Sequence, residues 1–360
     1  MVMEKKDEEE STYLKGVRNL CESGTKKLPR KYILPVPERP LQSKSPSARF
    51  KLPTIDFSQL QDSNGRPHAL RSLSRACQEY GFFQIVNHGI PSESLLSLLS
   101  SARRFFELSC EEREKYMSND IRAPVRYGTS FNQLQDGVFF WRDFLKLSCH
   151  PLLTFLPFWP SSPPQLREEA MSYAKQSKAL FLVLMEAILE TLGIGLSVLK
   201  ELKEGTHMMV INCFPPCPEP DLTLGMPPHS DYGFLTILLQ DKVKGLQVQC
   251  GDDWITVDPV ANSLFVNVGD HLEIFSNGRY KSVLHRVLVN SSKSRNSIAS
   301  VHSLPFDSIV RPSPELVKEN QRLYKDTDFA SFLNYMTTHE TNQKHFLESR
   351  KVANMSPDSQ

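Results

Sequence analysis

The stretch that decides the fold reads PPHSDYGFLTILL and covers residues 227–239. Its second half is a short run of large apolar and β-branched side chains, which is typical of a buried strand. Similar runs recur at intervals of about ten residues with turn residues between them, and many short strands at that spacing predict a jelly-roll sandwich or barrel. The other predicted strands are 209–211, 246–249, 254–257, 264–268, 283–289 and 297–302.

The chain in front of this β-rich region mixes helices with strands. Charged residues and several prolines predict an extended N-terminal arm with one short helix near 13–21. Beyond the arm, the apolar periodicity predicts strands at 52–57 and 82–86 and helices at 69–80, 92–108 and 164–192. We divide the chain into an arm (1–48), a mixed α/β region (49–200), a jelly-roll core (201–310) and a helical C-terminal tail (311–360). The predicted fold class is therefore mainly β with added helices.

Composition excludes several classes of function. The chain has 360 residues, of which 40% are hydrophobic and 23% are charged, and its formal net charge is +1. The chain has no excess of basic residues, so its charge does not indicate nucleic acid or an anionic membrane as a partner. Residues 1–20 contain an acidic run where a secretory signal needs an apolar core, and the longest apolar run, 179–189, is about half of the roughly 20 residues of a membrane-spanning helix. We expect a cytoplasmic protein, with the nucleus as the alternative compartment.

Two histidines are followed, two residues later, by a carboxylate: His229 by Asp231, and His271 by Glu273. With 41 acidic residues and 10 histidines in 360 positions, chance alone predicts roughly one such pair. The spacing places both side chains on one face of an extended strand, whereas on a helix they diverge. A proline pair favours extended backbone before His229, while Asp270 is typical of a helix cap before His271. We therefore predict a metal site at His229 and Asp231, and a structural role for His271.

A third ligand would have to come from another strand, and His285 lies in the alternating run 280–289. Two histidines and one carboxylate leave three open positions on an octahedral metal, which is the arrangement of non-haem Fe(II) oxygenases. Ten residues further on, Arg295 and Ser297 lie two apart and suit the far carboxylate of a metal-bound dicarboxylate. The alternatives are a half-buried strand histidine and a surface arginine.

At this combination the sequence resembles the plant small-molecule 2-oxoglutarate- and Fe(II)-dependent dioxygenases, which include flavonoid, gibberellin, salicylate and alkaloid oxygenases. The resemblance covers about residues 50–340 in the order that the family shows, which is more than a coincidence of short motifs. The further motifs that carry it are LPTID (52–56), CQEYGFFQIVNHGIP (77–91), WRD (141–143), PPCPEP (215–220), GLQ (245–247), VGD (268–270) and SNG (276–278).

The resemblance implies a double-stranded β-helix core with a helical N-terminal region. It also implies Fe(II) on His229, Asp231 and His285, and 2-oxoglutarate on Arg295 and Ser297 with Asn212 nearby. With O2 as the oxidant and ascorbate as the reductant, the expected reaction hydroxylates, desaturates or demethylates a small molecule and yields succinate and CO2.

Two positions depart from the family pattern. Phe214 stands where a tyrosine hydroxyl usually meets 2-oxoglutarate, so one hydrogen bond worth about 0.5–1.5 kcal/mol is missing. Val301 stands where flavonoid members commonly have a phenylalanine that stacks on the substrate. The valine at position 301 therefore argues against a flat flavonoid as the substrate.

By analogy with the family, aromatic and apolar residues should form the substrate pocket and suit a phenolic, terpenoid or alkaloid of plant hormone or specialised metabolism. The candidates are Tyr127, Phe131, Phe140, Phe144, Tyr232, Val301 and His302, although any of them could instead pack in the core. We expect a monomer. The alternatives are an ascorbate-dependent oxidase with the same iron ligands and a non-catalytic cupin-like binding protein, which would usually lack an equivalent of Arg295 and Ser297.

Overall fold

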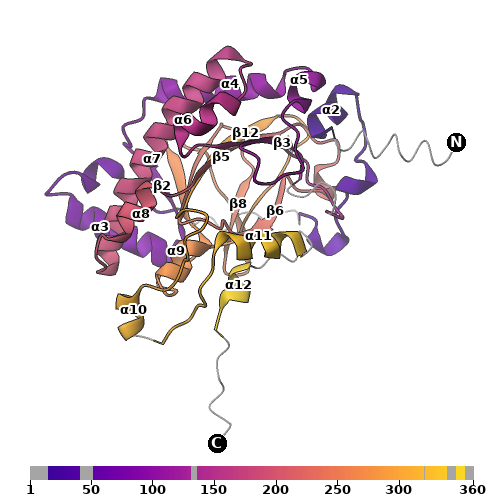
Figure 1. Ribbon diagram of the computed structural model, residues 1–360. Helices are drawn as coiled ribbons and strands as arrows, with labels where there is room; N and C mark the ends of the chain where they lie inside the picture. Colours follow the sequence, from indigo (N-terminus) through magenta and orange to yellow (C-terminus); the bar gives the residue numbers. More distant parts are fainter. Residues whose placement is uncertain (1–14, 41–51, 131–135, 320, 339–345, 353–360) are drawn as a thin grey trace, which may run out of the picture.

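The computed structural model describes residues 15–40, 52–130, 136–319, 321–338 and 346–352. Within these ranges the strands form an eight-stranded and a four-stranded sheet (Figure 1). The large sheet has the order β1 (Thr54–Asp56), β2 (Phe82–Val86), β10 (Leu264–Val268), β7 (Leu235–Gln240), β12 (Arg295–His302), β5 (His207–Phe214), β4 (Asp143–Ser148) and β3 (Val125–Gly128). The small sheet has the order β6 (Met226–His229), β11 (His285–Val287), β8 (Leu246–Cys250) and β9 (Asp253–Thr256).

The two sheets pack face to face through apolar side chains of alternating strand positions. Phe82 and Phe265 of the large sheet meet Leu246 and Val248 of the small sheet in one buried cluster. Every strand pair is antiparallel except β1 with β2. This arrangement is the predicted jelly roll, and the mainly β fold class with added helices is confirmed.

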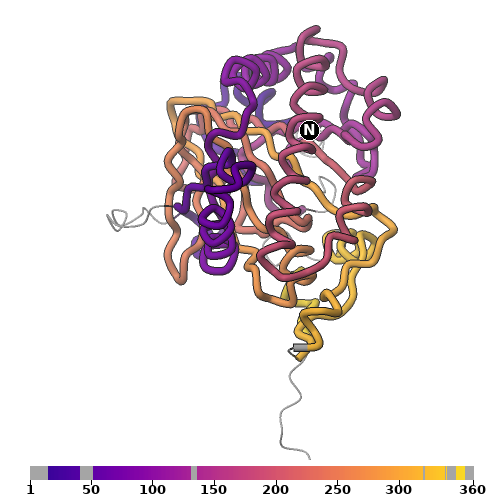
Figure 2. The backbone as a smooth tube through the Cα atoms, turned by 90° about the vertical axis from the view of Figure 1, so that its left-hand side faces the viewer, coloured from indigo at the N-terminus to yellow at the C-terminus, as the bar shows by residue number. Residues whose placement is uncertain are grey.

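Helices cover the outer face of the large sheet. The long helix α7 (Pro164–Leu192) has the bounds that its flanking prolines and glycine predict, and it packs with α4 (Ser92–Phe106) against β12. Figure 2 shows this helical layer and the C-terminal segment, in yellow, at one end of the molecule. The other helices are α2 (Val17–Glu22), α3 (Arg66–Arg75), α5 (Cys110–Glu114), α6 (Leu152–Phe155), α8 (Val198–Lys203), α9 (Asp270–Phe275), α10 (Pro314–Glu319), α11 (Phe329–Thr338) and α12 (Phe346–Arg350).

The N-terminal arm is folded over its described part, residues 15–40. The carboxylate of Asp143 accepts hydrogen bonds from the backbone N–H groups of Val17 (2.7 Å) and Arg18 (2.8 Å), so a buried residue of β4 holds the first turn of α2. Short helical turns follow at Arg30–Tyr32 and Val36–Glu38. The described part of the arm thus contains a short helix close to the one expected near 13–21, and Asp143 ties it to β4 of the large sheet. None of the helices in the described ranges is long and apolar enough to cross a membrane.

The register of the large sheet sets which side chains share the face towards the small sheet. Across β12, β5 and β4, Ser297 is opposite Asn212, which is opposite Phe144. Two residues along β5 and β4 from this pair, Val210 is opposite Lys146. Because side chains alternate along a strand, these residues point into the space between the sheets.

Candidate functional site

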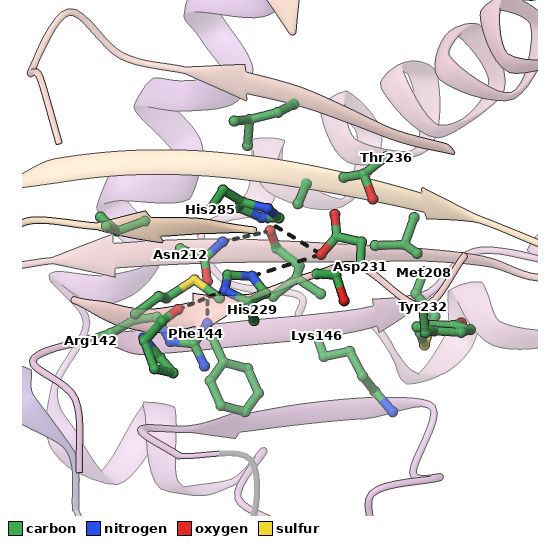
Figure 3. A pocket seen from close by; sticks show the side chains of 18 of the residues that line it. Arg142, Phe144, Lys146, Met208, Asn212, His229, Asp231, Tyr232, Thr236 and His285 are labelled. Atoms are coloured by element: carbon green, nitrogen blue, oxygen red, sulfur yellow. Dashed lines mark hydrogen bonds and ion pairs between the residues drawn. The ribbon is translucent and has the colours of Figure 1, made fainter. Parts of the chain in front are cut away.

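Three potential metal ligands meet at one end of the small sheet. His229 ends β6 and is opposite His285, the first residue of β11, and Asp231 follows two residues after β6. The Nε2 atoms of His229 and His285 each lie 3.8 Å from Oδ1 of Asp231. Figure 3 shows the three side chains converging on one point. The structure therefore brings together the three residues that the sequence singled out, with all three ligand atoms within 4.8 Å of one another.

Backbone and side-chain partners orient these ligands. Nδ1 of His229 lies 2.8 Å from the carbonyl oxygen of Pro227, and because a carbonyl only accepts, Nδ1 carries the proton and Nε2 keeps its lone pair. Oδ2 of Asp231 accepts a hydrogen bond of 2.6 Å from the side-chain amide of Asn267, which leaves Oδ1 facing the histidines. Burial, together with the neighbouring His285, lowers the pKa of His229 below its ordinary value. Its imidazole is therefore neutral at physiological pH, the form that binds metal.

The donor set fits Fe(II). Two imidazole nitrogens and one carboxylate oxygen on one side of a point leave the other side open for further ligands. That open side faces a cavity of about 300 Å³, whose walls are mostly apolar. The residues present could thus hold an iron ion with room for a chelating co-substrate.

Arg295 provides a buried cation in the same cavity. Its side chain is only 2% exposed, and Nη2 donates a 2.6 Å hydrogen bond to Oε1 of Gln240. Nε and Nη1 have no hydrogen-bond partner among the described residues. Buried donors of a charged group without partners are costly, so they indicate an anionic ligand. Ser297, two residues along β12, and Asn212 on β5 line the same end of the cavity.

The predicted substrate residues divide into two groups. Four of them line the cavity: Phe140, Phe144, Tyr232 and Val301. Phe131 lies outside the described residues.

The prediction that Tyr127 and His302 belong to the substrate pocket was wrong, because neither residue lines the cavity. Strand alternation turns Tyr127 to the opposite face of β3, where its hydroxyl donates to Oδ2 of Asp143. His302 likewise points away from the cavity and stacks between Phe181 of α7 and His207. His271 also lies outside the cavity, and its Nδ1 is 2.7 Å from the hydroxyl oxygen of Ser303. It belongs to α9, which corresponds to the short helix predicted after Asp270.

Sequence reasoning missed two parts of the cavity wall. One is cationic and comprises Arg126, Arg142 and Lys146; the other is apolar and comprises Phe329, Phe332, Leu333 and Met336 of α11 with Phe346 of α12. The alternation of Arg142, Phe144 and Lys146 is a strand-like period of two that could have placed the first group on one face.

Comparisons with known proteins agree with this geometry. The family model of the 2OG-Fe(II) oxygenase superfamily matches residues 205–303, and that of the N-terminal region of the non-haem dioxygenase in morphine synthesis matches residues 52–167. Protein DMR6-LIKE OXYGENASE 2 of Arabidopsis thaliana is 41% identical over 310 residues, which cover 85% of this chain and 88% of that protein. Flavanone 3-dioxygenase 3 of Oryza sativa subsp. japonica is 39% identical over 308 residues, which cover 84% of this chain and 93% of that protein.

Among solved structures, the crystal structure of JOX2 in complex with 2OG, Fe, and JA matches with a TM-score of 0.83 and 34% identity. The match covers 94% of this chain and 97% of that chain. Fold, site chemistry and relatives lead to the same assignment. The chain belongs to the 2OG-Fe(II) oxygenase superfamily and is a 2-oxoglutarate- and Fe(II)-dependent dioxygenase.

Proposed function

We propose that the enzyme oxidises a hydrophobic small molecule that binds above His229, Asp231 and His285. The observation that carries this proposal is the convergence of Nε2, Nε2 and Oδ1 at the floor of a mostly apolar cavity. Such a cavity binds an apolar molecule and excludes water, while the three ligands hold iron beside it.

Each residue of the site has a role that follows from its position. His229, Asp231 and His285 hold Fe(II), and Asn267 fixes the carboxylate through its 2.6 Å hydrogen bond. Bound iron and 2-oxoglutarate supply the oxidising chemistry, in which O2 is consumed, succinate and CO2 are released and the substrate is hydroxylated, desaturated or demethylated. Ascorbate serves as the reductant that keeps the iron in its ferrous state.

The co-substrate end of the cavity lies on β12 and β5. Arg295 binds the far carboxylate of 2-oxoglutarate through its guanidinium, in which Nε and Nη1 have no partner in the described structure. Ser297 offers a hydroxyl donor two residues along the same strand, and Asn212 lies directly opposite it. The ring of Phe214 has no hydroxyl for the co-substrate, and it lies against the guanidinium of Arg295, whose central carbon is 5.2 Å from the ring centre.

The substrate class follows from the cavity wall and from the relatives. Phe140, Phe144 and Tyr232 provide aromatic surface for a phenolic, terpenoid or alkaloid. The relatives include Jasmonate-induced oxygenase 4 and Feruloyl CoA ortho-hydroxylase 1, both of Arabidopsis thaliana, which supports a role in plant hormone or specialised metabolism.

Iron content and succinate formation test the metal assignment. His229→Ala, Asp231→Ala and His285→Ala should each lose iron and turnover while circular dichroism is unchanged. His271→Ala removes a buried histidine outside the cavity and should keep its iron. Wild-type turnover in Asp231→Ala would contradict the assignment.

Omitting 2-oxoglutarate separates the two kinds of oxygenase. Substrate oxidation should stop when 2-oxoglutarate is left out and succinate should match the product formed. Oxidation with ascorbate alone would favour the ascorbate-dependent oxidase.

A further inference from the structure

Three cationic residues line one wall of the cavity, and we call them the cationic wall. Arg126 lies on β3, Arg142 directly precedes β4, and Lys146 lies within β4. Arg126 is opposite Lys146 across the two strands. Phe144 lies between them, with the guanidinium carbons of Arg126 and Arg142 5.4 Å and 5.0 Å from its ring centre. Figure 3 shows Arg142, Phe144 and Lys146 in a row beside the histidines. The wall therefore presents three positive charges to one space.

The hydrogen bonds that the cationic wall makes are to neutral acceptors. Arg126 donates to the carbonyl oxygens of Ser118 (2.8 Å) and Ser130 (3.2 Å). Lys146 donates to the carbonyl oxygen of Ile121 at 2.8 Å. These hydrogen bonds satisfy N–H donors of the two side chains, but the uncharged carbonyl groups do not neutralise their positive charges.

Arg142 has even less compensation. Nη1 donates to Oδ1 of Asn212 at 3.2 Å, and Nε is buried without a partner in the part of the chain that the structure describes. Burial, with Arg126 close by, lowers the pKa of Arg142 to about 10 and that of Lys146 to about 8. Burial is the main cause of both shifts, and the nearby carboxylates, Asp143 and Asp136 for Arg142 and Asp120 for Lys146, oppose them only in part.

Carboxylates lie near the wall but form no ion pair with it among the described residues. Burial lowers the pKa of Arg126, and the charges of Asp136 and Asp120 partly oppose this effect. Neither comes within ion-pair distance of Arg126, Arg142 or Lys146 in the described structure. Desolvated positive charges that approach one another are stabilised when a ligand brings the missing anion.

In the proposed function, the far carboxylate of the co-substrate is bound away from this wall. Its proposed anchors, Arg295 and Ser297, lie on β12, and β5 separates β12 from β4. Adjacent strands are about 4.8 Å apart, so β12 and β4 are separated by roughly 10 Å. Arg126 lies one strand further away still. The part of the cavity wall formed by α11 offers Phe329, Phe332, Leu333 and Met336, and α11 contains no acidic residue.

We propose that the substrate carries a carboxylate, and that Arg126, Arg142 and Lys146 bind it while α11 contacts its apolar body. The proposal rests on the proposed function, since it names the class of molecule that is oxidised above the iron. A carboxylate matches the planar fork of an arginine, and its binding would also fix which carbon of the apolar body faces the metal.

Binding of matched acids and esters tests the proposal without turnover. The enzyme is loaded with Fe(II) and 2-oxoglutarate under anaerobic conditions and titrated calorimetrically with cinnamate, 1-naphthaleneacetate and dehydroabietate, and with the methyl ester of each. These acids span a small aromatic to a tricyclic terpenoid body. At least one acid should bind about tenfold more tightly than its ester, because the ester cannot form charge-assisted hydrogen bonds.

Variants locate the preference on the cationic wall. Lys146→Met and Arg126→Gln should each reduce the preference for the acid and leave binding of the ester unchanged. Lys178→Met is the matched control: Lys178 is also buried, its pKa is also lowered to about 8, and it donates to the carbonyl oxygens of Leu202 and Gly205 outside the cavity. That variant should keep the preference.

The outcomes separate this inference from the proposed function. Equal affinity for acid and ester in every pair, binding of none of the acids, or an acid preference that survives in both variants would overturn the inference. The visible absorption of the Fe(II)–2-oxoglutarate complex, recorded on the same samples, reports independently on the iron site. If that absorption is absent the proposed function fails, whereas its presence without an acid preference rejects the carboxylate alone.

Discussion

The guanidinium carbon of Arg295 lies 5.2 Å from the ring centre of Phe214, and the two residues are directly opposite each other on β12 and β5. The ring supports the cation from one side through a cation–π contact. Nη2 donates to Gln240, and Nε and Nη1 have no hydrogen-bond partner among the described residues. Phe214 therefore helps to position Arg295, although it lacks the hydroxyl of the usual tyrosine.

We predict that Arg295→Ala raises the 2-oxoglutarate concentration for half-saturation by roughly tenfold to a hundredfold, because a charge-assisted pair worth about 1.5–3 kcal/mol is lost. Phe214→Tyr should lower that concentration a few-fold by restoring one neutral hydrogen bond. Succinate formation against 2-oxoglutarate concentration measures both effects, with iron content as the control. An unchanged requirement in Arg295→Ala would argue for the ascorbate-dependent alternative.

Gly225 gives the ring of Phe214 its space. A Cβ atom on Gly225 would lie 2.5 Å from Cδ1 and 2.9 Å from Cε1 of that ring. Gly225→Ala should therefore displace the ring, cost about 1–3 kcal/mol of stability and raise the 2-oxoglutarate requirement severalfold. Gly195→Ala is the control, since a Cβ there meets nothing within 4 Å. Adding Phe214→Leu should recover the stability of Gly225→Ala but not its co-substrate affinity, and full recovery of both would reject the link.

The metal site could be predicted because its signal is local. His229 and Asp231 are two residues apart on extended backbone, so one strand fixes their relative position. His285 is 54 residues beyond Asp231, and its place depends on the pairing of β11 with β6, for which the residues alone offered only a candidate. The resemblance to known dioxygenases singled it out.

The sequence alone could not place Arg126 beside Arg142 and Lys146, because its position depends on sheet pairing at long range. Arg126 and Tyr127 are neighbours on β3, and only the register of β3 against β4 decides which of them faces the cavity. The sequence offered aromatic character, which favoured Tyr127, and the pairing selects Arg126. The prediction for His302 was wrong for a local reason, because alternation along β12 turns Val301 inward and His302 outward.

Asp143 fastens the N-terminal arm to β4. Its carboxylate accepts hydrogen bonds from the N–H groups of Val17 and Arg18 and from the hydroxyl of Tyr127. Asp143→Ala should leave these donors unpaired and destabilise the protein by about 3–5 kcal/mol. Asp143→Asn keeps one acceptor oxygen and should cost less. Urea unfolding measures both, and limited proteolysis should cut within residues 15–40 earlier in the alanine variant; wild-type stability in Asp143→Ala would contradict the role.

Val301 lines the cavity between Met208 of β5 and Thr236 of β7. We predict that Val301→Phe shifts the ratio of kcat/KM between a flat and a bulky substrate by about tenfold in favour of the flat one, because an added ring stacks on planar molecules and excludes others. The affinities for iron and 2-oxoglutarate should not change. Ile298→Val, on the other face of β12, is the control and should cost about 0.5–1.5 kcal/mol of stability with no change in preference. A lower melting temperature with unchanged preference in Val301→Phe would place Val301 in the core instead.

We predict that the stack of Phe181, His302 and His207 behind the large sheet lowers the stability of the protein in acid. The ring centres of His302 and Phe181 are 4.5 Å apart, and those of His302 and His207 are 4.1 Å apart. Burial, with His207 and Lys178 close by, holds the pKa of His302 well below its usual value, and burial lowers the pKa of His207 to about 3. Below about pH 6.5 the unfolded chain therefore binds protons that the folded chain excludes, and the free energy of unfolding falls as the pH falls.

His302→Phe should remove one of these protons while it keeps the stack. At pH 7 the variant should be within about 1 kcal/mol of the wild type, because neither nitrogen of His302 has a hydrogen-bond partner within the described ranges. Between pH 6.5 and pH 4 the free energy of unfolding should fall less steeply than in the wild type, by up to about 1.4 kcal/mol per pH unit. Urea unfolding across this range measures the slope. Phe181→Leu is the control, because it retains both histidines and should lower the stability equally at every pH. An unchanged slope in His302→Phe would show that His302 is not the group that resists protonation.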